Sequence, residues 1–110
     1  MQTDETLIEF VANAAATRLT PEETHAVGVL FVIRFGRGCQ EARTFAQYVN
    51  AARERLGLPK ITQAVAGNPT AKEKLELFRA ATEKIGDEAQ AVLVHLMDDR
   101  VSAKHRTERS

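Results

Sequence analysis

The sequence contains few of the residues that build reactive or metal-binding sites. Its 110 residues include one cysteine and no tryptophan, and no serine precedes Ser102. One cysteine excludes an internal disulfide and a zinc site made of several thiolates. The motifs of zinc metalloproteases, P-loop proteins and dinucleotide-binding proteins are absent as well. We therefore expect no enzymatic activity and no metal or other cofactor.

Long apolar runs and a secretory leader are also lacking. The longest uncharged apolar run, 26–33, is far shorter than the ~20 residues that a membrane-spanning helix needs. The start of the chain, Met1–Glu5, is acidic, whereas a secretory signal begins with basic residues. The sequence therefore predicts a cytoplasmic protein that has no membrane partner.

What the sequence has in quantity is helical patterning. Apolar residues recur three and four positions apart, and glycine or proline separates the segments. No segment shows the strict alternation of a half-buried strand. We expect an all-α protein, a compact bundle of five to six short-to-medium helices with no sheet. The expected helices are 4–19, 21–35, 39–56, 59–66, 69–85 and 87–101, in a single all-helical domain, 1–103, followed by a flexible basic C-terminal tail, 104–110.

Two helix starts in the first part of the chain carry capping signals. Thr20 is a natural N-cap, and Glu23 follows it at the spacing of a capping box. Thr6 and Glu9 have the same spacing, which predicts a second box near the start of the first helix.

The later helices are delimited by glycine and proline. Asn68 before Pro69 predicts an N-cap followed by the first residue of a helix. Gly86 alone separates the expected helices 69–85 and 87–101. Such a short hinge predicts that these two helices fold back on each other as an antiparallel pair.

The segment VGVLFVIRFGRGC, residues 27–39, is the most apolar part of the chain. Its β-branched residues allow a buried strand, but the unbroken length from Pro21 to Phe35 favours a helix. Such a helix is apolar on nearly every side, so it is either surrounded by its own domain or shared with a second copy. A small bundle has few helices with which to surround it, and we therefore expect a homodimer.

The end of this segment combines glycine, arginine and the single cysteine. The glycines lack the spacing of a phosphate-binding loop, so we interpret them as a helix stop and a hinge. Cys39 follows, between Arg37 and Arg43, which are neighbours of the kind that lower a thiol pKa. Because Cys39 also begins the apolar stripe of the next helix, we favour packing over a redox role.

Charge is distributed unevenly along the chain. Residues 34–60 carry six basic and two acidic residues, whereas 1–33 carry one arginine and five acids. A basic segment favours an acidic partner, either protein or nucleic acid. Our first hypothesis is a small regulatory or adaptor protein that binds a protein partner stoichiometrically, as an inhibitor, an antiactivator or a small assembly subunit does. The candidate contact residues are Phe31, Phe35 and Tyr48 as apolar anchors, with Arg34, Arg37, Arg43 and Gln47 as polar contacts.

The alternative hypothesis is a DNA- or RNA-binding regulator that uses the region 43–79. Residues 53–77 resemble the layout of a helix-turn-helix, with a helix, a short helix, a glycine-containing turn and another helix. The would-be recognition helix carries Lys72, Glu73, Lys74 and Glu76, so its charges cancel. Because attraction to phosphates dominates nucleic-acid affinity, this neutrality makes the alternative the weaker of the two.

Overall fold

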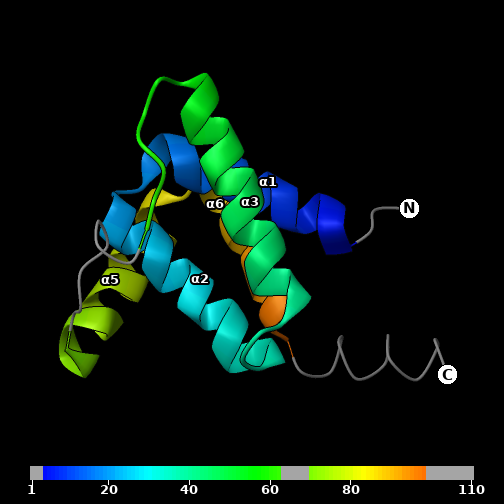
Figure 1. Ribbon diagram of the computed structural model, residues 1–110. Coiled ribbons are helices and arrows are strands. Elements are labelled where there is room, and N and C mark those ends of the chain that lie inside the picture. The colour runs from blue at the N-terminus through cyan, green and yellow to red at the C-terminus, as the bar shows by residue number, and fades with distance from the viewer. Residues whose placement is uncertain (1–3, 63–69, 99–110) are drawn as a thin grey trace, which may run out of the picture.

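We analysed a computed structural model of the chain, which describes residues 4–62 and 70–98 (Figure 1). Over these two stretches the protein is all-α, with no strand. The helices are α1 (Asp4–Arg18), α2 (Pro21–Phe35), α3 (Gln40–Arg55), α5 (Ala71–Lys84) and α6 (Asp87–Met97). The expected all-α bundle is confirmed, as is the helical rather than strand conformation of 27–35.

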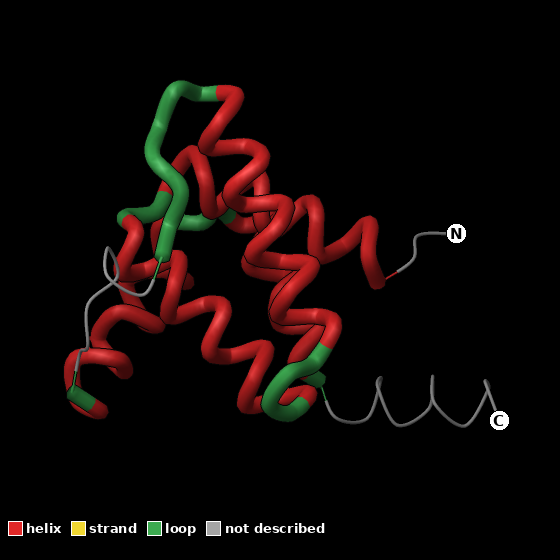
Figure 2. The backbone as a smooth tube through the Cα atoms, viewed as in Figure 1, coloured by secondary structure: helices red, strands yellow, loops and turns green. Residues whose placement is uncertain are grey.

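Two segments differ from the sequence-based boundaries. Residues 59–62, the start of the short helix expected over 59–66, are not helical, and the rest of that segment lies outside the described residues. Figure 2 shows the loop that follows α3 returning towards the start of α2. The proposed tail, 104–110, also lies outside the described part of the chain, so the expected domain limits stay a prediction.

The capping box at the start of α2 is confirmed. The Thr20 hydroxyl accepts a hydrogen bond from the Glu23 N–H at 3.1 Å, and the Thr20 N–H donates to the Glu23 carboxylate at 2.9 Å. The box expected at Thr6 is wrong, because α1 already begins at Asp4 and Thr6 lies inside the helix.

The start of α5 also differs from the expected one. Thr70 is its N-cap, and Glu73 completes a reciprocal capping box with hydrogen bonds of 3.2 and 3.4 Å. The helix therefore begins at Ala71, whereas Asn68 and Pro69 were expected to begin it; these two residues lie outside the described ones.

The helices α1 and α3 form the largest contact of the fold; in Figure 1, α3 passes in front of α1, and α2 lies to the lower left of both. The core lies among these helices and the inner faces of α5 and α6. Its largest fully buried side chains are Phe31, Phe45, Ile8, Ile85, Val11, Val27 and Val49. The Phe31 ring lies 6.3 Å from that of Phe35 and 5.2 Å from that of Phe45, measured between centroids.

The expected antiparallel pairing of α5 and α6 is wrong. The structure packs α5 against α2 and α6 against α1, and the two helices have hardly any contact with each other. Gly86 has a φ of 99° there, and the Arg18 guanidinium lies against it while donating a 2.7 Å hydrogen bond to the Ile85 carbonyl. Each of the two helices therefore packs against an earlier helix of the chain and not against its neighbour in sequence.

Candidate functional site

An apolar groove lies between α2 and α3. The turn 36–39 joins the two helices at one end, and from there they diverge (Figure 1). The groove has a volume of about 250 Å³. Its lining comes from both helices and from the loop after α3: Thr24, His25, Gly28, Val29, Val32, Ala42, Phe45, Ala46, Val49, Asn50, Ile61 and Thr62.

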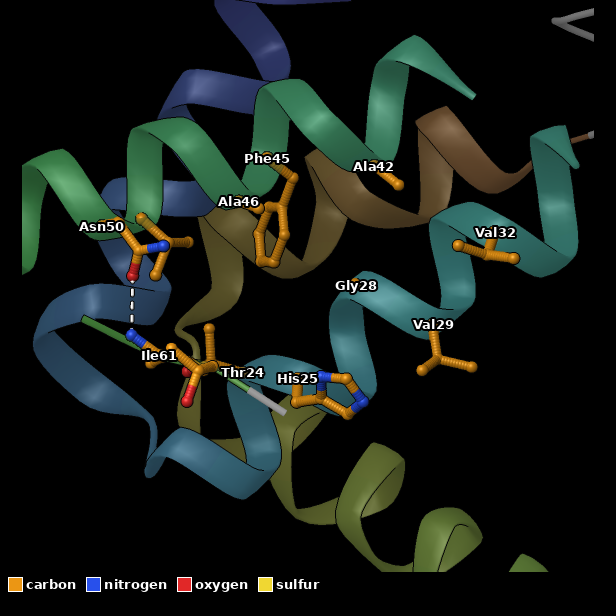
Figure 3. A pocket seen from close by; sticks show the side chains of 12 residues that line it. Thr24, His25, Gly28, Val29, Val32, Ala42, Phe45, Ala46, Asn50 and Ile61 are labelled. Carbon is orange, nitrogen blue, oxygen red and sulfur yellow. Dashed lines mark hydrogen bonds between the residues drawn. The ribbon is translucent and has the colours of Figure 1, made fainter. Parts of the chain in front are cut away.

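The groove exists because small residues face each other across it. Gly28 on α2 lies opposite the Phe45 ring, and Ala42 and Ala46 line the α3 side (Figure 3). A Cβ atom built on Gly28 would be 3.8 Å from the Phe45 ring atoms Cδ2 and Cε2, which is ordinary van der Waals contact. The floor is therefore packed, and the space above the small residues is left open.

Polar groups hold one end of the groove in place. The Asn50 side-chain oxygen accepts a 2.8 Å hydrogen bond from the Ile61 N–H, which ties the loop to α3 (Figure 3). The Arg53 guanidinium is buried and donates to the Pro59 carbonyl at 2.8 Å, so it holds the same loop. The imidazole of His25 lies at this end of the groove (Figure 3).

The outward side of α2 remains apolar and uncovered in the described structure. Val29 and Val32 are half-buried at the edge of the groove, and Ile33 is 70% exposed. Ile33 does not line the groove but directly follows Val32, which does, and exposed apolar residues grouped in this way are a feature of interaction sites.

The predicted aromatic contacts are not on a common surface. Phe31 is completely buried and packs against Phe45, so its proposed role as a partner anchor is wrong. Phe35 is half-buried, and the Arg34 guanidinium carbon lies 5.0 Å from its ring centroid. A cation over the ring face stabilises this pair within the chain itself.

Tyr48 faces α1 and does not line the groove. Its hydroxyl donates a 2.8 Å hydrogen bond to the Glu5 carboxylate. This hydrogen bond raises the pKa of Tyr48 above its ordinary value of 10, and desolvation and the charges of Glu5 and Glu9 act in the same direction. The phenol therefore connects α3 to α1.

The remaining predicted contacts are exposed. Arg37 lies in the turn after α2, and Arg43 and Gln47 lie on α3. Gln47 borders a separate hollow between α1 and α3. Of the seven predicted residues, Phe31, Arg34 and Phe35 lie next to one another, but the seven do not form one site, and none of them lines the groove. The signal that was missed is the set of small residues, Gly28, Ala42 and Ala46, on the two helices that flank the turn.

Not all basic residues of 34–60 are exposed. Arg53 is buried, whereas Arg55 is exposed and donates to the Asn13 side-chain oxygen at 3.4 Å. Cys39, at the N-cap of α3, is half-buried with its sulfur 3.7 Å from the Phe31 carbonyl oxygen. These contacts favour packing roles for Arg53 and Cys39.

One buried carboxylate joins α2 to α5. Glu23 is 6% exposed and forms a 2.7 Å ion pair with Lys84. Burial raises the pKa of Glu23, but the hydrogen bonds from Lys84 and Thr20 outweigh it, so the pKa lies below its ordinary value of 4.5. A carboxylate kept ionised by two partners stabilises the fold and is a poor general base.

Within 4–62 and 70–98, no three His, Cys, Asp or Glu side chains lie close enough together to hold a metal ion. Among the helices in these stretches, none is both long and apolar enough to span a bilayer. Comparison of the chain with protein-family models, curated proteins and solved structures finds no match in any of the three.

Proposed function

We propose that the protein acts by stoichiometric binding of a protein partner, one of whose apolar side chains enters the groove between α2 and α3. The observation that carries this proposal is the groove itself, an unfilled apolar hollow of about 250 Å³ beside the exposed Ile33. Burying a Leu, Ile, Val or Phe side chain there would stabilise a complex by about 1.5–3 kcal/mol.

The size of the groove favours a side chain over an organic ligand. Pockets for drug-sized molecules and cofactors have volumes of roughly 300–1,000 Å³ and carry a few convergent polar groups. This groove is smaller, and two of its polar residues, Asn50 and Thr24, already form hydrogen bonds within the chain. An amphipathic helix laid along α2 and α3 is the recognition mode that this shape suits.

The charges around the groove give the partner a preferred character. Arg37 and Arg43 are exposed near the turn that joins the two helices. An apolar anchor flanked by acidic side chains would meet both the groove and these guanidinium groups. Regulatory proteins of the inhibitor, antiactivator or assembly-subunit kind work in this way, and we place this one in the cytoplasm, where its single cysteine would stay reduced.

Two alanines on α3 provide a matched test. Ala46 lines the groove, whereas Ala51 is also exposed but lies elsewhere on the helix. A photo-crosslinking amino acid at position 46 should capture a defined partner from the organism that encodes the chain, and the same group at position 51 should not. The substitution Ala46→Arg should then prevent stoichiometric co-purification of that partner, with Ala51→Arg behaving like the wild type.

The result that refutes the proposal is equal capture by the Ala46→Arg and wild-type proteins. Nucleic-acid binding through 43–79 has weaker support, because Arg53 is buried and the charges of Lys72, Glu73, Lys74 and Glu76 cancel. A gel shift at ~50 mM salt, where phosphate contacts are strong, tests it independently.

A further inference from the structure

The outward side of α2 carries a stripe of residues that we call the α2 stripe. It consists of Glu22, His25, Val29, Val32 and Ile33 on the helix, and of Arg37 in the turn that follows. The members from Glu22 to Val32 lie three or four residues apart, which places them along one side of the helix, and Ile33 directly follows Val32. Glu22 and Arg37, at the two ends, are exposed, and among the described residues neither has an ion-pair or hydrogen-bond partner for its side chain.

The α2 stripe is complementary to itself when reversed. Its acid lies at the N-terminal end, its base lies just beyond the C-terminal end, and valine lies in the middle. Along the helix axis, Glu22 lies about 10 Å before Val29, and Phe35, the last helical residue, lies about 9 Å after it. A second copy rotated by a two-fold axis through Val29 therefore brings Glu22 of each chain towards Arg37 of the other.

The opposite orientation is disfavoured. Two parallel stripes would place Glu22 against Glu22 and Arg37 against Arg37, and like charges in contact weaken association. The antiparallel arrangement also sets the positive N-terminal end of one helix dipole beside the negative C-terminal end of the other. Charge and dipole thus favour the same two-fold arrangement.

The apolar surface around the stripe is wide enough for more than one line of contact. The groove with α3 adjoins it on one side. On the other side, Leu30 and the 61%-exposed Val94 line a second hollow between α2, α5 and α6. In a two-fold pair, Ile33 of each chain comes to lie opposite His25 of the other, beside the mouth of the groove.

We propose that a second copy of this chain docks antiparallel along the α2 stripe and covers the groove with its own Ile33. The proposal rests on the proposed function, since it names the first protein that this surface binds. Dimer formation then competes with the binding of any other partner, because that partner must displace Ile33 of the second copy to enter the groove.

Sedimentation of the full chain over a range from micromolar to several hundred micromolar tests the proposal. The monomer has a mass of 12.2 kDa, so the dimer is resolved directly. Glu22→Arg and Arg37→Glu should each raise the dimer dissociation constant at least tenfold, since each places like charges together. The double variant, Glu22→Arg with Arg37→Glu, should restore it towards the wild-type value.

Control variants separate the interface from general effects. Glu88→Arg changes an exposed acid that borders hollows on the α1 side of α6, and it should leave the dissociation constant unchanged. Ile33→Asp should dissociate the dimer, whereas Leu56→Asp, at another exposed apolar residue, should not. Circular dichroism checks that each variant is folded. If Glu22→Arg weakens α2, Arg37→Glu still tests the interface, because Arg37 lies outside the helix.

The outcomes distinguish this proposal from the proposed function. A chain that sediments as a monomer at all concentrations overturns the dimer but leaves the groove-crosslinking test untouched. A dimer that is insensitive to both charge reversals uses another surface and also overturns the proposal. If the dimer responds as expected and the crosslinker at position 46 captures only a second copy of this chain, the result supports the inference and counts against a separate partner.

Discussion

Replacing Gly28 by alanine should stabilise this protein and weaken its binding. Gly28 lies in the middle of α2, where glycine costs about 1 kcal/mol relative to alanine because of its greater backbone freedom when unfolded. The added Cβ would lie 3.8 Å from two atoms of the Phe45 ring, so it fits without displacing either helix. We therefore expect the free energy of unfolding to rise by about 1 kcal/mol.

Urea denaturation followed by circular dichroism measures this change. For a domain of this size, about 1 kcal/mol raises the melting temperature by roughly 4–8 °C. Gly36, at the C-cap of the same helix, is the matched control. It has a φ of 102°, and a Cβ atom added there would meet no described atom within 4 Å, so Gly36→Ala should lose roughly 1–3 kcal/mol through backbone strain alone.

The binding consequence follows from the position of Gly28 in the groove. Its new methyl group takes up space opposite Phe45 that an incoming side chain would use. Dimerisation and partner capture should therefore weaken while stability rises. A destabilised Gly28→Ala protein would show that α2 and α3 approach each other more closely than a 3.8 Å contact allows, and a stabilised one with unchanged binding would show that the groove is not the contact site.

Three further predictions concern residues outside the groove. The Glu23 pKa is lower in the folded than in the unfolded state, so the stability that its ionised form contributes is complete above about pH 4.5 and is lost as pH falls through the folded pKa. In Glu23→Gln, the free energy of unfolding should therefore depend less on pH in that range. Tyr48, the single tyrosine, should ionise above pH 10 in an ultraviolet titration, and Glu5→Gln should bring that pKa down, with no change if the hydrogen bond is absent in solution. Phe31→Ala should cost about 3–5 kcal/mol in urea unfolding, whereas Ile33→Ala, at a residue 70% exposed, should change monomer stability little; equal losses would contradict the assigned burial.

Local features of the fold were predictable from the sequence because they depend on neighbours in the chain. The Thr20 capping box joins residues three apart, and its hydrogen bonds form as predicted. The helical conformation of 27–35 followed from unbroken length after Pro21, which outweighed the β-branched residues. Even local signals compete, however: Thr6 has the capping spacing, but α1 already begins before it.

Which helices pack against each other was not predictable, since it depends on all the contacts that the helices of the chain can make with one another. Gly86 makes a hairpin of α5 and α6 reasonable locally, yet α5 packs on α2 and α6 packs on α1, and the Arg18 side chain lies against the turn between them. This packing leaves much of α5 uncovered, with Leu75 66% exposed although it continues the apolar stripe of that helix.

The candidate site shows the same division most clearly. From the sequence, Phe31 and Ile33 are both large apolar residues of one helix, and nothing local separates their roles. The fold buries Phe31 completely and leaves Ile33 70% exposed, because α5 and α3 pack against α2 without covering the side that carries Ile33. The sequence by itself determined an all-helical chain with an excess of apolar surface on α2. Only the tertiary structure decided where that excess lies, because a groove requires two diverging helices with small residues, Gly28 and Ala46, on facing sides.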